Sequence, residues 1–341
     1  MVLIQIIPKI SEWSWSKGAT WIERNRQKRN LMHRDVRGRV VLITGASRGI
    51  GRRAAVLLAR RGAKLALTAR SQDELERTAR ACLSEALAQG IEPQVMVEAG
   101  DMTIPADRER IVAETAMRYG GVDVLINAAG VCSFGEFSTS SQQILRRVME
   151  VNFFAAVEMV RLTQPYLERS ATQGIGEGWR PAVVNVASIC GRWGIPSMAE
   201  HCASKHALVG WSEAIRAEFV RYGIDVLLVL PGLVRSDDLQ RHLLRNEGKI
   251  YLDFAGAPPP EEVARDILKS LERRRGETPS GWVSWGVWWS RRLFPRAVRF
   301  FMHRKVWRFA RREGQNVAQR EGQKLQQRLD RQRISPTWTG S

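Results

Sequence analysis

The residues best suited to chemistry in this chain are His201 and Lys205, in the run His-Cys-Ala-Ser-Lys. In a helix, a spacing of four positions puts both side chains on one face. Histidine has an unperturbed pKa of roughly 6.5 and is a common general acid or base, and a neighbouring ammonium group disfavours its protonated form. Ser188 follows a β-branched run, and its hydroxyl would point towards a ligand site at the end of that strand. These side chains could exchange a proton with a bound substrate.

A second candidate site lies where the apolar run from Val40 to Thr44 leads into three glycines. The run predicts a buried strand, and an alanine-rich helical segment follows, as in the first unit of a dinucleotide-binding fold. Gly45 permits a tight turn, Gly49 a close approach of a pyrophosphate, and Gly51 close packing of helix on strand. The helix start would offer N–H groups to the phosphate. The glycine spacing alone also fits a turn in an ordinary α/β protein.

The elements around these residues alternate along the chain. Apolar runs predict strands at 39–44, 64–69, 94–98, 122–127, 182–187 and 225–230, with a last strand at 276–284. Helical patterns occupy 49–61, 72–89, 105–119, 142–169, 201–222 and 261–274. The alternation predicts an α/β fold, a Rossmann-type doubly wound parallel sheet with helices on both faces. A ligand would then bind beyond the carboxyl ends of the strands.

The residues that follow these strands, together with the glycine turn, are the candidate cofactor contacts. They are Thr44, Gly45, Ser47, Arg48, Gly49, Ile50, Gly51, Arg70, Asp101, Met102, Asn127, Ala128, Ala129, Gly130, Pro231, Gly232, Val234 and Ser236. Arg70 follows the second strand, where an acid would favour NAD, and Arg48 lies in the glycine turn. Arginines there suit the 2′-phosphate of NADP, so we expect NADP rather than NAD. Asp101 could cap the next helix or accept a hydrogen bond from the adenine amino group.

Two further segments have more than one interpretation. Asn152 lies among apolar residues within the predicted helix 142–169, where asparagine is unfavourable. It is either a buried amide that bonds locally or a helix-distorting residue that orders a water molecule. The segment 232–260 is long enough to form a lid over a substrate.

The charge of the chain is concentrated at its ends. The net charge is +18, and residues 1–38 carry eight Lys and Arg against three acids, while residues 290–341 carry fourteen against three. A nucleic-acid enzyme would more often show basic residues across a folded face, so we do not expect a nucleic-acid partner. Trp13, Trp15 and Trp21 lie in the first arm. In the second, Trp282, Trp285, Trp289, Leu293, Ala297 and Phe300 recur at helical spacing, with arginines between them.

Two interpretations of these arms stay open. They bind an anionic membrane surface as amphipathic segments, or they pack on their own domain or on a second subunit. We expect an arm at 1–38, the Rossmann domain at 39–284 and a basic extension at 285–341. We also expect a homo-oligomer. The four cysteines form no C-x-x-C pair, which predicts a reduced, cytoplasmic setting; if the arms bind lipid, the protein is peripheral at the membrane. No metal-ligand spacing appears, so we expect no metal.

Taken in order, these motifs resemble the short-chain dehydrogenase/reductase family over about residues 39–275. The resemblance rests on T-G-x-x-x-G-x-G at 44–51, N-A-A-G at 127–130, Asn152, Ser188, and P-G at 231–232. It implies hydride transfer between a nicotinamide and an alcohol or carbonyl carbon. Ser188 would then bind the substrate oxygen, Lys205 would hold the nicotinamide ribose, and Asn152 would complete a water relay. The chain is most similar to the NADP-using reductases with a membrane-associated C-terminal extension, such as the retinol and hydroxysteroid dehydrogenase-like groups. Together with the apolar arms, this motif set predicts a lipophilic alcohol or ketone as substrate.

The chain departs from the family at one position. The family pattern is Y-x-x-x-K, and His201 stands where the tyrosine would exchange the proton. Imidazole is shorter than phenol by on the order of 2 Å, and a misplacement of about 1 Å can cost a hundredfold in rate. We therefore expect weakened or pH-shifted activity. The alternatives are a dinucleotide-binding relative that acts as a sensor or scaffold, and a module that tethers itself to membranes through its arms.

Overall fold

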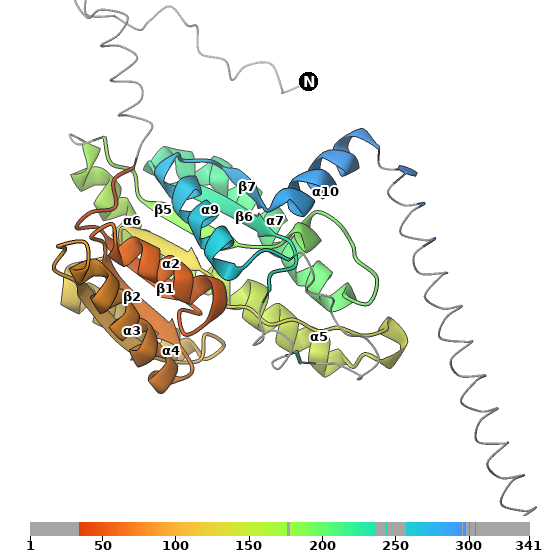
Figure 1. The fold of residues 1–341 in the computed structure, drawn as a ribbon, viewed down its shortest axis with the longest axis horizontal. Coiled ribbons are helices and arrows are strands. Elements are labelled where there is room, and N and C mark those ends of the chain that lie inside the picture. Colours follow the sequence, from red (N-terminus) through yellow and green to blue (C-terminus); the bar gives the residue numbers. More distant parts are fainter. Residues whose placement is uncertain are drawn as a thin grey trace, which may run out of the picture.

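The computed structural model describes residues 34–175, 178–235, 243–244, 257–294, 296–297, 300 and 304. Its centre is a seven-stranded sheet in the order β3-β2-β1-β4-β5-β6-β7, with every neighbouring pair parallel (Figure 1). The strands are β1 (Val40–Thr44), β2 (Lys64–Ala69), β3 (Gln94–Ala99), β4 (Val124–Asn127), β5 (Ala182–Val186), β6 (Asp225–Pro231) and β7 (Glu277–Ser280). Every residue of β1, β4 and β5 is buried, as expected for a parallel sheet that is covered on both faces.

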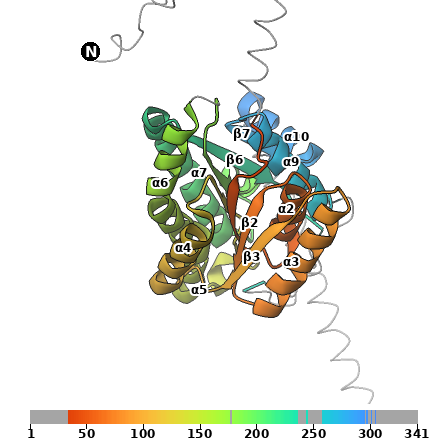
Figure 2. The ribbon, with the colours of Figure 1, turned by 90° about the vertical axis from the view of Figure 1, so that its left-hand side faces the viewer.

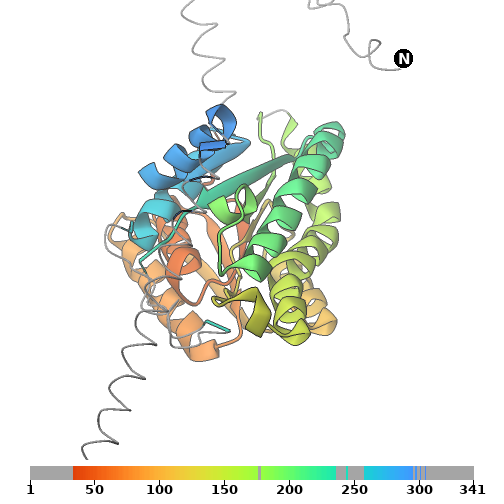
Figure 3. The ribbon, with the colours of Figure 1, turned by 90° about the vertical axis from the view of Figure 1, so that its right-hand side faces the viewer.

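Helices form a layer on each side of the sheet (Figures 2 and 3). The first layer contains α2 (Gly49–Ala59), α3 (Gln72–Leu87) and α9 (Pro260–Glu272), whose buried faces share one apolar cluster. The second contains α4 (Pro105–Tyr119), α6 (Ala155–Gln173) and α7 (Ala199–Phe219). Shorter elements are α5 (Gln142–Met149), η2 (Phe137–Thr139), η3 (Glu150–Phe154), η5 (Ile189–Gly191) and η6 (Val220–Tyr222). The predicted doubly wound fold is confirmed.

Two predicted elements were wrong in extent. The helix expected at 142–169 is interrupted by the π-helical turn η3, which contains Asn152, before it continues as α6. The strand expected at 276–284 ends at Ser280, because Gly281 turns the chain with a φ of 81°. The helix α10 (Trp282–Leu293) begins directly afterwards and projects from the end of the sandwich in Figure 1.

The chain enters the domain earlier than residue 39. Val36 is buried, and Arg34 is buried with its guanidinium bonded to Asp225 at 2.5 Å and to the carbonyl oxygen of Leu271 at 2.6 Å. Residues 1–33 and 305–341, and most of the predicted lid, lie outside the described residues. Within the described part of the chain, no helix has the length and apolar character needed to cross a membrane.

The strand register fixes where a ligand can bind. Thr44 at the end of β1 pairs with Thr68 on β2 and with Asn127 on β4, and Asn127 pairs with Asn185 on β5. The central strands therefore end at one level. The strand order reverses between β1 and β4, which is where such sheets open to a ligand.

Candidate active site

A cavity of about 530 Å³ lies at these strand ends. Most of the predicted cofactor contacts line it: Gly45, Ser47, Arg48, Gly49, Ile50, Gly51, Arg70, Asp101, Met102, Ala128, Ala129, Gly130 and Val234. The sequence analysis missed other lining residues: Ala69, Ser71, Gly100, Val131, Cys132, Arg147, Val151, Leu244 and Pro260. Ser71 and Gly100 adjoin residues that the strand-end rule did select. Arg147 lies on α5, and no local pattern in the sequence points to it.

The glycine turn fits a bound pyrophosphate. A β-carbon at Gly45 would lie 2.7 Å from the backbone of Ala129, and one at Gly51 would lie 2.3 Å from the carbonyl oxygen of Gly45. A β-carbon at Gly49 would meet no protein atom within 4 Å among the described residues, although its φ of 51° favours glycine. Among the described residues, no side chain caps the start of α2 at Arg48, and the first turn of this helix contains no acid. Its first amide groups can therefore bind an anion.

Thr44 and Asn127, the last residues of β1 and β4, make buried hydrogen bonds that tie the ends of the central strands together. The Thr44 hydroxyl accepts hydrogen bonds from the backbone N–H groups of Ala128 and Ala129, each at 3.2 Å. The Asn127 amide donates to Asn185 Oδ1 at 3.0 Å and to the carbonyl oxygen of Ala156 at 3.3 Å. Both side chains are buried, and neither is among the residues that line the cavity.

The part of the cavity around Arg48 and Arg70 is rich in arginine. Arg70 is exposed, and Arg48 Nε lies 3.8 Å from Glu74. Asp101 accepts hydrogen bonds from the Thr103 N–H at 2.9 Å and hydroxyl at 2.8 Å, and Arg147 lies 3.2 Å from its other oxygen. Burial raises the pKa of Asp101, but these bonds outweigh it and hold that pKa below its ordinary value. Asp101 thus orders the turn before α4 and does not cap the helix.

Asn152 lies in the π-helical turn η3, and its amide bonds residues of other elements. Its Oδ1 accepts from the Val131 N–H at 2.8 Å, and its Nδ2 donates to the Val131 carbonyl oxygen at 2.9 Å and to the Ser204 hydroxyl at 3.0 Å. The wider π-helical turn places this amide beside the loop that follows β4. The predicted water relay remains a prediction.

His201 shares the Val131 carbonyl with Asn152. Its Nδ1 lies 3.3 Å from that oxygen, and because a carbonyl only accepts, Nδ1 carries the proton and Nε2 keeps a lone pair. Burial first, and then the charge of Lys205, lower the pKa of His201 to about 4, against a small opposing effect of the carbonyl. The imidazole is therefore neutral at physiological pH.

Lys205 is almost wholly buried, and its Nζ donates to the carbonyl oxygen of Val186 at 3.1 Å. Burial lowers its pKa to about 8, although the nearby Cys132 and Cys190 act in the opposite direction. A β-carbon at Gly130 would lie 3.7 Å from Lys205 Nζ and 3.3 Å from Asn152 Oδ1. The ammonium group therefore lies directly beneath the floor of the cavity.

Ser188 follows the end of β5, two residues after the Val186 carbonyl that binds Lys205. Its hydroxyl donates to the carbonyl oxygen of Pro231 at 3.2 Å and accepts from the Cys190 N–H at 3.1 Å. Pro231 thus reaches the site through its carbonyl. A β-carbon at Gly232 would lie 2.9 Å from Ser284 Oγ on α10. Ser236 lies outside the described residues.

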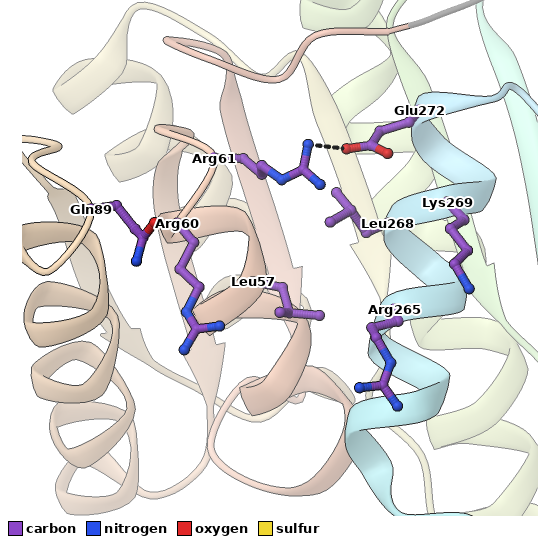
Figure 4. Close-up of a pocket in the computed structure, with 8 residues that line it drawn as sticks. All are labelled: Leu57, Arg60, Arg61, Gln89, Arg265, Leu268, Lys269 and Glu272. Atoms are coloured by element: carbon purple, nitrogen blue, oxygen red, sulfur yellow. Dashed lines mark ion pairs between the residues drawn. The ribbon is translucent and has the colours of Figure 1, made fainter.

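A second cavity, of about 370 Å³, lies between α2 and α9 (Figure 4). It is lined by Leu57, Arg60, Arg61, Gln89, Arg265, Leu268, Lys269 and Glu272. Arg61 forms an ion pair with Glu272 at 2.7 Å across it. It contains no predicted site residue, and across the described residues no group of three His, Cys, Asp or Glu could hold a metal ion.

Comparison with known proteins gives one consistent result. A family profile described as short chain dehydrogenase matches residues 39–247. The 11-beta-hydroxysteroid dehydrogenase-like 4A of Arabidopsis thaliana is 34% identical over 73% of this chain and 78% of its own. A dehydrogenase/reductase SDR family protein 7-like of Anopheles gambiae is 29% identical over 82% and 86%. The crystal structure of levodione reductase aligns with a TM-score of 0.63 at 25% identity, covering 73% of this chain and 98% of its own.

Proposed function

This chain belongs to the short-chain dehydrogenase/reductase family, and on that premise we propose that it is an NADP-dependent oxidoreductase acting on a lipophilic alcohol or ketone. The family consists of oxidoreductases that use nicotinamide dinucleotides. The observation that carries the proposal is the cavity that the uncapped start of α2 and the glycine turn share with Arg48 and Arg70.

The charge of the cavity supports NADP over NAD. The 2′-phosphate distinguishes the two dinucleotides, and Arg48 and Arg70 lie where the ribose of the adenosine would bind. Glu74 lies close to Arg48, and Asp101, the acid that lines the cavity, is already bonded to Thr103 and Arg147. The pyrophosphate would rest on the first amides of α2, and Lys205 would hold the nicotinamide ribose.

The lining of the cavity supports a lipophilic substrate. Val131, Val151, Val234 and Leu244 contribute apolar side chains to it. The name of the Arabidopsis relative, a hydroxysteroid dehydrogenase-like protein, is consistent with a substrate of this class.

The neutral form of His201 supports faster alcohol oxidation than ketone reduction at neutral pH. The bound nicotinamide would supply the hydride chemistry. Nε2 of His201 would take the hydroxyl proton of an alcohol, while its Nδ1–H stays on the Val131 carbonyl. Ser188 would bind the substrate oxygen after exchanging its bond to Pro231. Ketone reduction would instead need the imidazolium form, which the low pKa makes scarce.

The same histidine favours a second candidate function. A dinucleotide-binding relative without turnover, acting as a sensor or scaffold, would keep the cavity but would not need a proton donor. Arg48, Arg70 and the glycine turn serve both functions equally, so binding and turnover must be measured separately.

The test is a titration of the full chain with NADPH and with NADH, followed by turnover assays on a panel of lipophilic alcohols. Arg70→Ala should weaken NADPH binding by about tenfold or more, since a charge-assisted bond to phosphate is lost, and should leave NADH binding unchanged. Arg77→Ala is the matched control, because Arg77 is an exposed arginine on α3 that pairs with Glu74 and does not line the cavity. Failure of both dinucleotides to bind would overturn the proposal. Binding without turnover of any alcohol would favour the second candidate.

A further inference from the structure

The helix α10 carries a row of exposed apolar side chains. Trp282, Trp285, Trp289 and Leu293, here called the tryptophan stripe, are 79%, 41%, 49% and 59% exposed. Their spacing of three, four and four residues places them on one face of the helix. Phe294, directly after the helix, is exposed as well. A contiguous exposed apolar surface of this kind marks an interaction site.

The opposite face of α10 is anchored to the domain. Ser284 is buried against Gly232, and Trp288 donates a hydrogen bond from Nε1 to Glu277 at 2.8 Å. Trp288 also packs against the apolar cluster that contains Ala187, the residue before Ser188. The stripe is therefore held in a fixed orientation on a helix that projects from the end of the sheet (Figure 1), and its side chains are exposed.

Charge distinguishes the possible occupants of this surface. Residues 290–341 carry fourteen Lys and Arg against three acids, and among them Arg296 and Arg304 are exposed. A second copy of this face, or the basic segment 1–38 of the same chain, would bring positive charge against positive charge. An anionic lipid surface brings the opposite charge. Tryptophan is enriched at the depth of the lipid headgroups, where its ring is buried and its N–H stays hydrated.

We infer that the tryptophan stripe of α10 docks on the interfacial region of an anionic lipid bilayer. Docking buries the indole rings among the headgroups, while the arginines that follow meet the lipid phosphates and carboxylates. This function is independent of the proposed oxidoreductase activity, because it requires neither a dinucleotide nor turnover.

The test is co-sedimentation of the full chain with vesicles of phosphatidylcholine alone, and of equal parts phosphatidylcholine and phosphatidylserine. We expect stronger binding to the anionic vesicles, and a loss of binding as salt is raised. The triple variant Trp282→Ser/Trp285→Ser/Trp289→Ser keeps every charge and should lower the partition coefficient by about two orders of magnitude. The control Phe137→Ser/Ile175→Ser removes two exposed apolar side chains elsewhere and should bind like the wild type.

Three results would overturn this inference. The first is a triple variant that binds as well as the wild type, because the basic tail alone would then explain binding. The second is equal loss in the control variant. The third is wild-type protein that self-associates in sedimentation velocity without lipid while the triple variant is monomeric, because the stripe would then be an interface between copies. If the triple variant unfolds, Trp282→Ser alone, at the most exposed position, should still weaken binding about fivefold.

Discussion

The most decisive prediction is that the rates of ketone reduction and alcohol oxidation depend differently on pH, because they need different protonation states of His201. With a pKa of about 4, the imidazole is neutral at pH 7 in all but about one molecule in a thousand. Ketone reduction needs the protonated form, so its rate should rise about tenfold for each unit by which pH falls from 7 to 5. Alcohol oxidation needs the neutral form and should be nearly constant over that range. It should decline above about pH 8, where Lys205 loses its charge.

The assay follows the consumption of NADPH with a ketone, and the formation of NADPH from NADP with the matching alcohol. Both rates are measured from pH 5 to pH 9. His201→Tyr supplies a longer side chain that is protonated at pH 7, and should raise ketone reduction at that pH by about a hundredfold. His201→Gln is the control, because an amide can hydrogen-bond a substrate but cannot exchange its proton. A reduction rate that does not rise towards pH 5, or full alcohol oxidation by His201→Gln, would refute this reasoning.

Three further predictions follow from the packing of the domain. Gly51→Ala should lower the thermal midpoint of unfolding, because the added β-carbon would lie 2.3 Å from the carbonyl oxygen of Gly45. Gly49→Ala should chiefly weaken dinucleotide binding in a fluorescence titration, because its β-carbon would enter the open space of the cavity. Arg34→Ala should cost about 3 kcal/mol in urea unfolding, because it removes the hydrogen bonds of Arg34 to Asp225 and to two backbone carbonyls, although Arg274 and Arg180 stay paired with Asp225. Between pH 6.5 and 4 the unfolded chain binds a proton at His201 that the folded chain does not. Wild-type protein should therefore lose up to about 3 kcal/mol relative to His201→Tyr as pH falls through that window, measured by urea unfolding at both ends.

The regular part of the fold could be predicted from the sequence because its signals are local. The buried strands are short apolar runs, and the helices between them show apolar periodicity, so parallel pairing on a two-sided sheet follows. The errors occur where the decisive contact is distant. No residue near Asn152 in the sequence indicates that its amide binds Val131, which lies 21 residues earlier, and that contact accompanies the π-helical turn. Nor does the sequence near Arg34 reveal its partner Asp225, which is 191 residues away.

The site shows the same division. Strand-end residues could be selected by rule, and most of them do line the cavity. The rule selects positions and does not say where a side chain points. It therefore selected Thr44 and Asn127, although Thr44 bonds the backbone of Ala128 and Asn127 bonds Asn185 on β5. Arg147 was missed because it reaches Asp101 from a helix that is 46 residues further along the chain.

The role of Val131 connects these observations to function. Its carbonyl oxygen accepts hydrogen bonds from both Asn152 Nδ2 and His201 Nδ1. The loop after β4 therefore sets the tautomer of the histidine. A tyrosine at the same position has no ring nitrogen to bond there, and its single hydroxyl would serve the substrate alone. Compared with the tyrosine of the family pattern, His201 would therefore offer a proton acceptor at neutral pH in place of a proton donor, and the backbone would hold it in position. The low pKa of the imidazole would then set how the rate of the proposed reaction in each direction depends on pH, while the bond to Val131 leaves Nε2 available to the substrate.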